Sequence, residues 1–194
     1  MVSAELRRRE ILDGLADHVL AHGLEASSLR PLAAAADTSD RMLIYYFSDK
    51  SALLASVLHH TTQRLATVLA RSAPKAPQPY DQLRVTIWKI LGRKTLRPYM
   101  QLWLDIAARA ARGEPPYKAV GGQIAQGFIS WIADLLSVDD EPNRHALAVQ
   151  ILLQIEGMLV LEAVGLHDLI QTTLQSRHVR GLTTHVRARK VGKT

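Results

Sequence analysis

The stretch GLEASSLRPLAAAADTSDRMLIYYFSDKSALL, residues 23–54, decides the fold of this chain. Its first apolar run has Pro31 early enough for the first turn of a helix and predicts a helix over residues 29–36. Residues 37–39, Asp-Thr-Ser, then interrupt the pattern, and a second short helix is predicted over residues 40–47. Two short helices joined by a break of about three residues have the spacing of a helix-turn-helix, a motif whose second helix enters the major groove of DNA.

The residues on either side of this block complete a small helical domain. Apolar residues recur at three- and four-residue steps from Leu6 to Leu20, which predicts an amphipathic helix that ends at Gly23. From Lys50 the apolar pattern continues without a break until Pro74, so a long fourth helix is expected to leave the small domain.

The rest of the chain is also predicted to be helical. Residues 74–79, PKAPQP, contain three prolines in six positions and form a linker. Five further helices are predicted at about 80–92, 96–112, 116–137, 142–164 and 167–180. The expected fold is therefore all-α, with about nine helices. We divide it into a helix-turn-helix domain over 1–50, a helical bundle over 51–180 and a basic tail over 181–194.

Composition and charge exclude several classes of protein. The absence of cysteine excludes a disulfide scaffold and a thiolate metal site and favours a reducing cytoplasm. The N-terminal sequence MVSAELRRRE lacks the apolar segment of a signal peptide, and no membrane span is expected. The formal charge of +6 arises entirely in residues 177–194, which we interpret as a solvated terminus or, alternatively, as an accessory DNA-binding arm.

Residue patterns typical of catalysis are missing from the sequence. His18 and His22 are four residues apart on one predicted helix, but no third ligand is spaced to hold a metal with them. The sequence has no Gly-x-Ser-x-Gly motif, and the C-terminal Gly-Lys-Thr has Arg187 where a phosphate-binding loop needs glycine. We therefore expect no enzymatic activity, no cofactor and no metal.

The helix-turn-helix block resembles the DNA-binding domain of the TetR-type transcriptional regulators. The family's pattern is present as Ser27-Ser28-Leu29-Arg30, Leu32-Ala33, Ser39, Leu43, Tyr45-Tyr46-Phe47, Lys50 and Leu53-Leu54. The resemblance is close over residues 6–56 and covers the remainder only in outline. Asp37 replaces the usual glycine of the turn, a position where aspartate tolerates a left-handed backbone. Arg41, Met42 and Ile44 also depart from the pattern, so base preference does not carry over.

The resemblance implies a set of DNA contacts. Tyr45 and Lys50 would hold phosphates, and Arg41 would contact guanine, whose two major-groove acceptors match a guanidinium. Tyr46 is expected either to contact phosphate or to pack in the core, and Phe47 to pack in the core. The complete set of predicted DNA-binding residues is Ser27, Ser28, Arg30, Ser39, Asp40, Arg41, Ile44, Tyr45, Tyr46 and Lys50.

The resemblance also implies a pocket for a small-molecule effector among the later helices. The candidate lining residues are Trp88, Tyr99, Trp103, Phe128, Trp131 and Met158. They offer flat apolar walls, which suit an apolar and aromatic ligand. Their helical spacing fits one buried face, which is more often plain core than the wall of a pocket.

The helix predicted over 142–164 is apolar nearly all round, so a single core face does not account for it. We expect a second subunit on its other side. The resemblance implies a homodimer through this helix and the one over 167–180.

Together these features predict a homodimeric cytoplasmic regulator, a repressor that a small apolar ligand releases from a palindromic double-stranded DNA operator. The alternative is a helical interaction or small-molecule-binding protein without specific DNA recognition. The net charge of zero over residues 1–72 supports that alternative.

Overall fold

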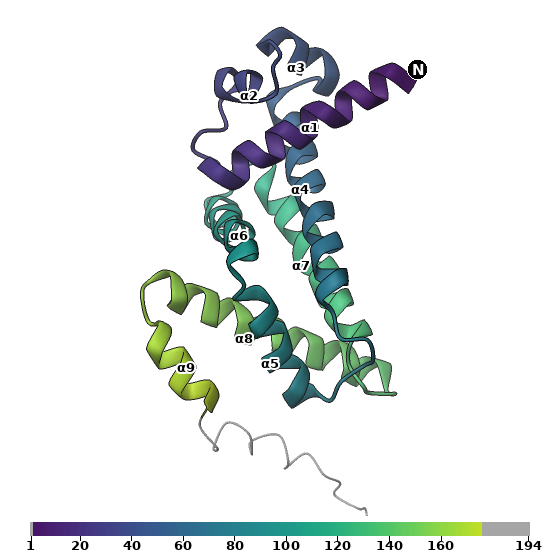
Figure 1. Ribbon diagram of the computed structural model, residues 1–194, viewed down its shortest axis with the longest axis vertical. Coiled ribbons are helices and arrows are strands. Elements are labelled where there is room, and N and C mark those ends of the chain that lie inside the picture. The colour runs from purple at the N-terminus through teal and green to yellow at the C-terminus, as the bar shows by residue number, and fades with distance from the viewer. Residues whose placement is uncertain (1, 176–194) are drawn as a thin grey trace, which may run out of the picture.

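The computed structural model describes residues 2–175 and is all-helical over that range (Figure 1). The elements are α1 (Val2–His22), α2 (Leu29–Ala35), α3 (Asp40–Phe47), α4 (Lys50–Ser72), α5 (Tyr80–Leu91), the 3-10 turn η1 (Lys94–Leu96), α6 (Arg97–Ala111), α7 (Tyr117–Asp134), α8 (Glu141–Ala163) and α9 (His167–Gln175). The predicted all-α class with about nine helices is thus confirmed for the described residues. The basic tail and the predicted end of the last helix, beyond residue 175, lie outside them.

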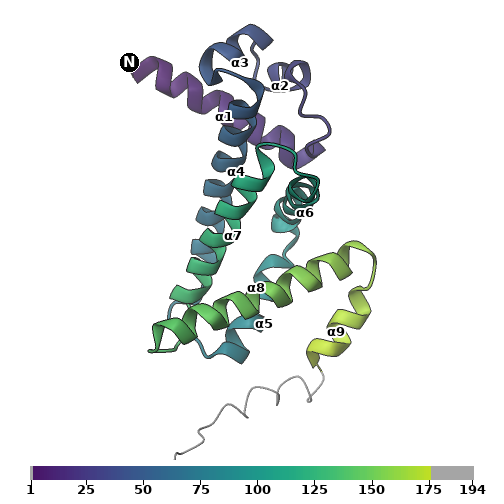
Figure 2. The ribbon, with the colours of Figure 1, turned by 180° about the vertical axis from the view of Figure 1, so that it is seen from behind.

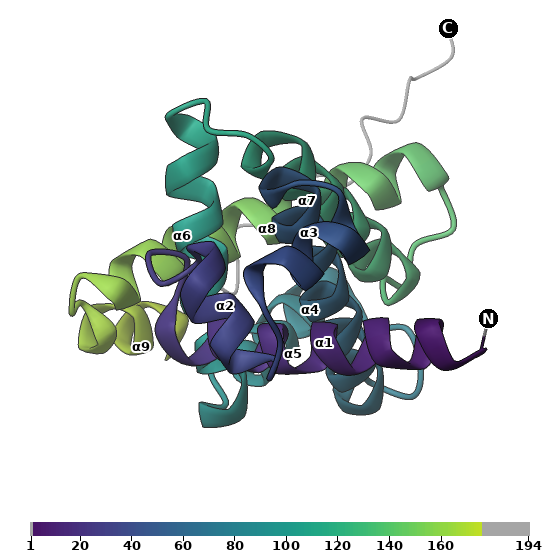
Figure 3. The same ribbon diagram turned by 90° about the horizontal axis from the view of Figure 1, so that it is seen from above.

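The helices form two connected groups along the long axis of the molecule. Figures 1 and 2 show α1, α2 and α3 at one end, with α4 and α7 running side by side away from them. At the far end α8 crosses these helices, together with α5, and α9 folds back beside α8. Seen from above, in Figure 3, α1 lies across the other helices of its own end.

Backbone conformation explains where several helices end. Gly23, Gly113 and Gly165 follow α1, α6 and α8 and take positive φ angles of 71°, 77° and 86°, which glycine adopts without strain. The helix predicted to reach residue 137 instead ends at Asp134. The chain turns there because Gln78 donates its N–H to the Leu135 carbonyl at 2.8 Å.

One hydrophobic core joins the small N-terminal domain to the larger helical part. Leu15 of α1 and Leu43 of α3, both fully buried, belong to the same cluster as Leu102 and Ile106 of α6. A second cluster fills the far end between α4, α5, α7 and α8. The first cluster contains residues from both sides of residue 50. The domain boundary proposed at that residue therefore divides the chain but does not coincide with a break in the packing, and it stays a prediction.

Two stripes of α8 have different surroundings. Ile151, Ile155 and Leu159 are buried in the second cluster, whereas Leu153 and Val160 are 66% and 51% exposed. By length and hydropathy alone this helix could cross a membrane, which is weak evidence because core helices of soluble proteins meet the same criterion. Its buried stripe makes it part of the packed fold, and its exposed stripe lacks a partner within the described chain.

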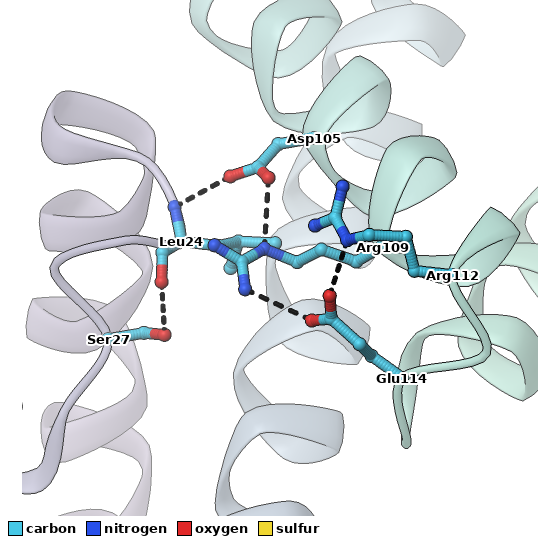
Figure 4. Close-up of polar contacts among 6 residues, drawn as sticks. All are labelled: Leu24, Ser27, Asp105, Arg109, Arg112 and Glu114. Atoms are coloured by element: carbon cyan, nitrogen blue, oxygen red, sulfur yellow. Dashed lines mark hydrogen bonds and ion pairs between the residues drawn. The ribbon is translucent and has the colours of Figure 1, made fainter.

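A polar junction fixes the N-terminal domain against α6 (Figure 4). The backbone N–H of Leu24 donates to one Asp105 carboxylate oxygen at 2.9 Å, and Arg109 Nε donates to the other oxygen at 2.9 Å. Arg109 also reaches Glu114 at 3.3 Å, and the Ser27 hydroxyl donates to the Leu24 carbonyl. The loop between α1 and α2 is therefore tied to α6 through its backbone at Leu24.

Aromatic and ionic contacts reinforce this junction. The Arg109 guanidinium lies 5.5 Å from the centre of the Tyr117 ring, and Tyr117 is itself buried at the start of α7. Burial by itself would lower the pKa of Arg109, but its hydrogen bond and attraction to Asp105 raise it. Burial raises the pKa of Tyr117. Both groups therefore keep their usual protonation states at neutral pH, and the junction persists there.

Replacement of Asp105 tests the junction. Asp105→Ala leaves the Leu24 N–H and the Arg109 guanidinium without their shared acceptor, so we expect a loss of about 1–3 kcal/mol in the free energy of unfolding, measured by urea denaturation. Asp134→Ala, at the exposed end of α7, is the matched control and should change it by less than about 0.5 kcal/mol. Equal losses in the two variants would contradict the role given to Asp105.

Candidate nucleic-acid interface

The third helix has one face in the core and one face open to solvent. Leu43 and Phe47 are buried and anchor α3 against the domain, as expected for Phe47. On the opposite side Arg41 is exposed, and Tyr45 is 77% exposed, which is unusual for a tyrosine. A short helix with a fixed inner face thus presents a row of polar and aromatic side chains outward.

The start of α3 is held by its N-cap. Ser39 has extended backbone angles, and its hydroxyl accepts the N–H of Met42 at 3.3 Å. The preceding turn takes a φ of 47° at Asp37, which confirms the left-handed conformation expected there. The side chain of Arg7, from α1, donates to the Asp37 carbonyl at 3.1 Å. The turn between α2 and α3 is therefore held by hydrogen bonds at both of its ends, Asp37 and Ser39.

The start of α4 lies next to the end of α3. Asp49 caps α4 by accepting the Ala52 N–H at 2.8 Å, and Lys50 is exposed at the first helical position. Tyr46 is half-buried against the first core cluster and meets Tyr45 edge to face at 5.5 Å. Lys50 and Tyr45 are thus free to meet a ligand, while Tyr46 serves partly as packing.

The structure exposes most of the predicted DNA-binding residues. Those that are exposed are Ser28, Arg30, Ser39, Asp40, Arg41, Tyr45 and Lys50, and those that are half-buried are Ile44 and Tyr46. Ser27 requires a correction, because it is 4% exposed and its hydroxyl is used by the Leu24 carbonyl. Met42 was not predicted but is 38% exposed at the start of α3. Its position one residue after Arg41 was the only indication in the sequence.

The predicted ligand-binding residues do not share one cavity among the described residues. Phe128 and Trp131 line a groove of about 710 Å³ between α4 and α7. Tyr99 and Trp103 line a separate void of about 30 Å³, and Trp88 is buried in the second core cluster. Met158 packs at the edge of that cluster. Only the pair Phe128 and Trp131 therefore faces a space large enough for a small molecule.

Glu156 occupies an unusual environment beside Trp103. The indole N–H of Trp103 donates to both carboxylate oxygens, at 2.9 and 2.8 Å. Burial raises the pKa of Glu156, and the hydrogen bond from Trp103 offsets part of that rise. This bond joins α8 to α6.

The family model described as bacterial regulatory proteins of the tetR family matches residues 11–57. This range holds the turn, α2, α3 and the start of α4, the elements whose geometry is given above. Over these residues the chain matches the tetR family. Among curated proteins, the HTH-type transcriptional regulator BetI of Paraburkholderia phytofirmans is 31% identical over 114 residues, which are 57% of this chain and 58% of that protein. BetI of Paraburkholderia xenovorans is 30% identical over 52% of each chain.

The chain therefore matches little more than half the length of these curated relatives. Solved structures extend the likeness of fold over most of this chain. A transcriptional regulator from Rhodococcus sp. Rha1 has a TM-score of 0.65 at 21% identity and covers 84% of this chain and 86% of its own. GusR of Salmonella enterica has a TM-score of 0.56 at 18% identity, with 79% and 81% covered. At these identities the likeness concerns the fold alone.

Two serines test the local construction of the motif. Ser39 and Ser28 occupy the N-cap positions of α3 and α2, but only the Ser39 side chain makes the capping hydrogen bond. Ser39→Ala should lower the free energy of unfolding by about 1 kcal/mol, and Ser28→Ala, the matched control, by less than about 0.5 kcal/mol. Urea unfolding measures both. An equal loss would mean that the capping bond at α3 is not significant.

Proposed function

We propose that this chain is a DNA-binding transcriptional regulator of the TetR family. The observation that carries the proposal is the outward face of α3, where Arg41 and Tyr45 are exposed while Leu43 and Phe47 hold the helix from behind. A helix presented in this way fits the major groove, about 12 Å wide, with its N-terminal residues at the base edges.

Each exposed residue has a role that its chemistry suits. The Arg41 guanidinium matches the O6 and N7 acceptors of guanine, while Lys50 and the Tyr45 hydroxyl are placed for phosphate oxygens on either side. Ser28 and Arg30, at the start of α2, are exposed for a further phosphate contact. Phosphate contacts fix the position of the motif, and the contact of Arg41 supplies sequence preference.

The competing function is a helical interaction protein that does not recognise DNA. Residues 1–72 have no net charge, which weakens non-specific attraction to DNA. Selection on random duplex DNA separates the two functions. Recovery of one enriched, two-fold symmetric sequence supports a regulator, and recovery of none supports the alternative.

A homodimer follows from the exposed stripe of α8. Leu153 and Val160 are exposed on α8, Val164 is exposed at its C-cap, and exposed apolar residues continue at Leu166 in the following turn and Leu169 in α9. Burial of such a surface against a second copy removes apolar area from water and places two copies of α3 around a two-fold axis. In the dimer the two recognition helices meet successive major grooves, about 34 Å apart, and so require a palindromic operator.

Regulation completes the proposal. We assign the protein as a repressor whose operator affinity falls when a small apolar effector binds in the larger helical part. An effector has this effect only if it binds more tightly to a dimer whose α3 helices are wrongly spaced for the operator.

The roles of Lys50 and Arg41 are distinguished by different measurements. Lys50→Ala should weaken binding to all duplexes alike and reduce the slope of log affinity against log salt by about one per contact. Arg41→Ala should lower the binding free energy by about 1–3 kcal/mol for duplexes with the preferred base pair at one position, and should relax the base preference at that position only. Lys75→Ala, in the exposed linker, is the control and should change neither. Unchanged sequence preference in Arg41→Ala would exclude a base contact.

The dimer is tested on α8. Val160→Asp places a charge in the apolar surface and should cost about 3 kcal/mol or more of association, which shifts the protein to monomer in analytical ultracentrifugation. Gln101→Asp adds a charge on the exposed side of α6 and should leave the dimer intact. A monomeric wild-type protein at micromolar concentration would contradict the proposed interface.

A further inference from the structure

The groove between α4 and α7 differs chemically between its two ends. Both helices run from the helix-turn-helix end toward α8, so residue number marks position along the groove (Figure 2). Near the helix-turn-helix its walls carry Ser56, His59 and Gln123, and at the far end they carry Phe128 and Trp131. The groove is thus polar at one end and apolar and aromatic at the other.

The dimensions of the groove suit an elongated molecule. Its wall on α4 extends from Ala55 to Leu69, roughly 20 Å along a helix axis. Small side chains at Ala55, Ala66 and Gly127 leave room between the helices, and the volume of about 710 Å³ is typical of small-molecule sites. A narrow ligand that lies parallel to α4 is therefore the best fit.

A second pocket, which is basic, lies next to the polar end and shares lining residues with it. This pocket, of about 460 Å³, shares Ser56 and His59 with the groove and adds Arg8 and Arg9 from α1. Glu5 lines it as well and offsets one of the two arginine charges. Three other members of its lining are engaged with side chains, since His60 bonds Asp13 at 2.7 Å and Gln63 and His59 bond each other at 3.0 Å.

The two arginines differ from their neighbour Arg7. Arg7 pairs with Glu10 at 3.2 Å, whereas the ion pairs found among the described residues include neither Arg8 nor Arg9. The Arg8 guanidinium instead lies 4.9 Å above the ring of Phe47, the last residue of α3. These two guanidinium groups are available to pair with an anion.

We propose that the α4–α7 groove binds a long-chain carboxylate, with its head at Arg8 and Arg9 and its hydrocarbon chain along the groove toward Phe128 and Trp131. The basic pocket supplies the charge complement of the head, and the apolar walls shield the chain from water. As an effector, such a ligand rests on the regulatory function proposed above. Binding itself does not depend on that function.

The same geometry connects the ligand to the recognition helix. An anion that pairs with Arg8 draws the guanidinium away from the Phe47 ring and so weakens a contact at the end of α3. At the same time the hydrocarbon chain lies between α4 and α7, and α4 begins at Lys50 beside the motif. Occupancy therefore acts on the helix-turn-helix from both α1 and α4.

A homologous series of ligands tests the assignment with the full-length protein. Octanoate, decanoate, dodecanoate and tetradecanoate are titrated below their micelle concentrations, followed by tryptophan fluorescence and calorimetry. Affinity should rise about fourfold per methylene group, as expected for buried hydrocarbon. Dodecanol should bind at least about tenfold more weakly than dodecanoate, because it lacks the charge. Absence of binding, or equal affinity for the alcohol, would overturn the proposal.

Two glycines of α7 locate the site. A Cβ atom added at Gly127 or at Gly122 meets no atom within 4 Å, so both positions have open space at the start of a larger side chain. Only Gly127 lines the groove. Gly127→Leu should reduce dodecanoate affinity at least about tenfold, while Gly122→Leu, the matched control, keeps it. Equal affinity in the two variants would place the ligand elsewhere.

The remaining outcomes separate this inference from the proposed function. Arg8→Gln combined with Arg9→Gln should weaken dodecanoate and leave dodecanol unchanged, and an equal loss for both ligands would overturn the head assignment. If Gly127→Leu changes the oligomeric state and keeps ligand affinity, a second copy of the chain occupies the groove and the proposal fails. If the protein binds dodecanoate but enriches no duplex DNA, the ligand site is supported and the proposed regulatory function is rejected. If it enriches a duplex but does not bind dodecanoate, the regulatory function is supported and the ligand site is rejected.

Discussion

The position of the helix-turn-helix depends on the acceptor that the Leu24 N–H finds in Asp105. Gly23 ends α1 with a positive φ, so the following N–H has left the helix and needs a partner elsewhere. A carboxylate from α6 meets it at 2.9 Å, and Arg109 holds that carboxylate from the other side. The position of the loop before α2 is thereby fixed by the larger helical part and not only by contacts within the loop.

The hydrophobic packing beside this bond has the same effect. α2 has seven residues and α3 has eight, lengths at which an isolated helix is not stable in water. Leu43 and Phe47 anchor α3 in a cluster that also contains Ile106 of α6 and Tyr117 of α7. The N-terminal domain thus owes part of its core to helices that follow it by more than fifty residues. Any movement of α6 or α7 would therefore change the packing beneath the motif.

Sequence patterns predicted the helices better than they predicted the contacts between them. Apolar periodicity and capping residues gave the bounds of α3 as observed, because both are properties of neighbouring residues. Ser27 was expected at the surface, since a serine beside a helix start suits a phosphate, but its hydroxyl is used by a carbonyl three residues earlier. Asp105 and Glu156 had no distinguishing pattern, because their partners lie 81 and 53 residues away along the chain. Aromatic spacing likewise could not distinguish Trp131, at a groove, from Trp88, in the core.

The short pairing at Gln78 constrains how α4 and α7 can separate. Gln78 donates to the Leu135 carbonyl at 2.8 Å, and its own carbonyl accepts the Ser137 N–H at 2.9 Å. The linker after α4 is therefore hydrogen-bonded to the turn after α7, which joins the two helices at the end that lies far from the helix-turn-helix. At the other end, Tyr117 of α7 is buried in the same cluster as Leu53 of α4. The two helices are thus joined at both ends, so a molecule that enters between them must bend the helices or shift the packing beneath the motif.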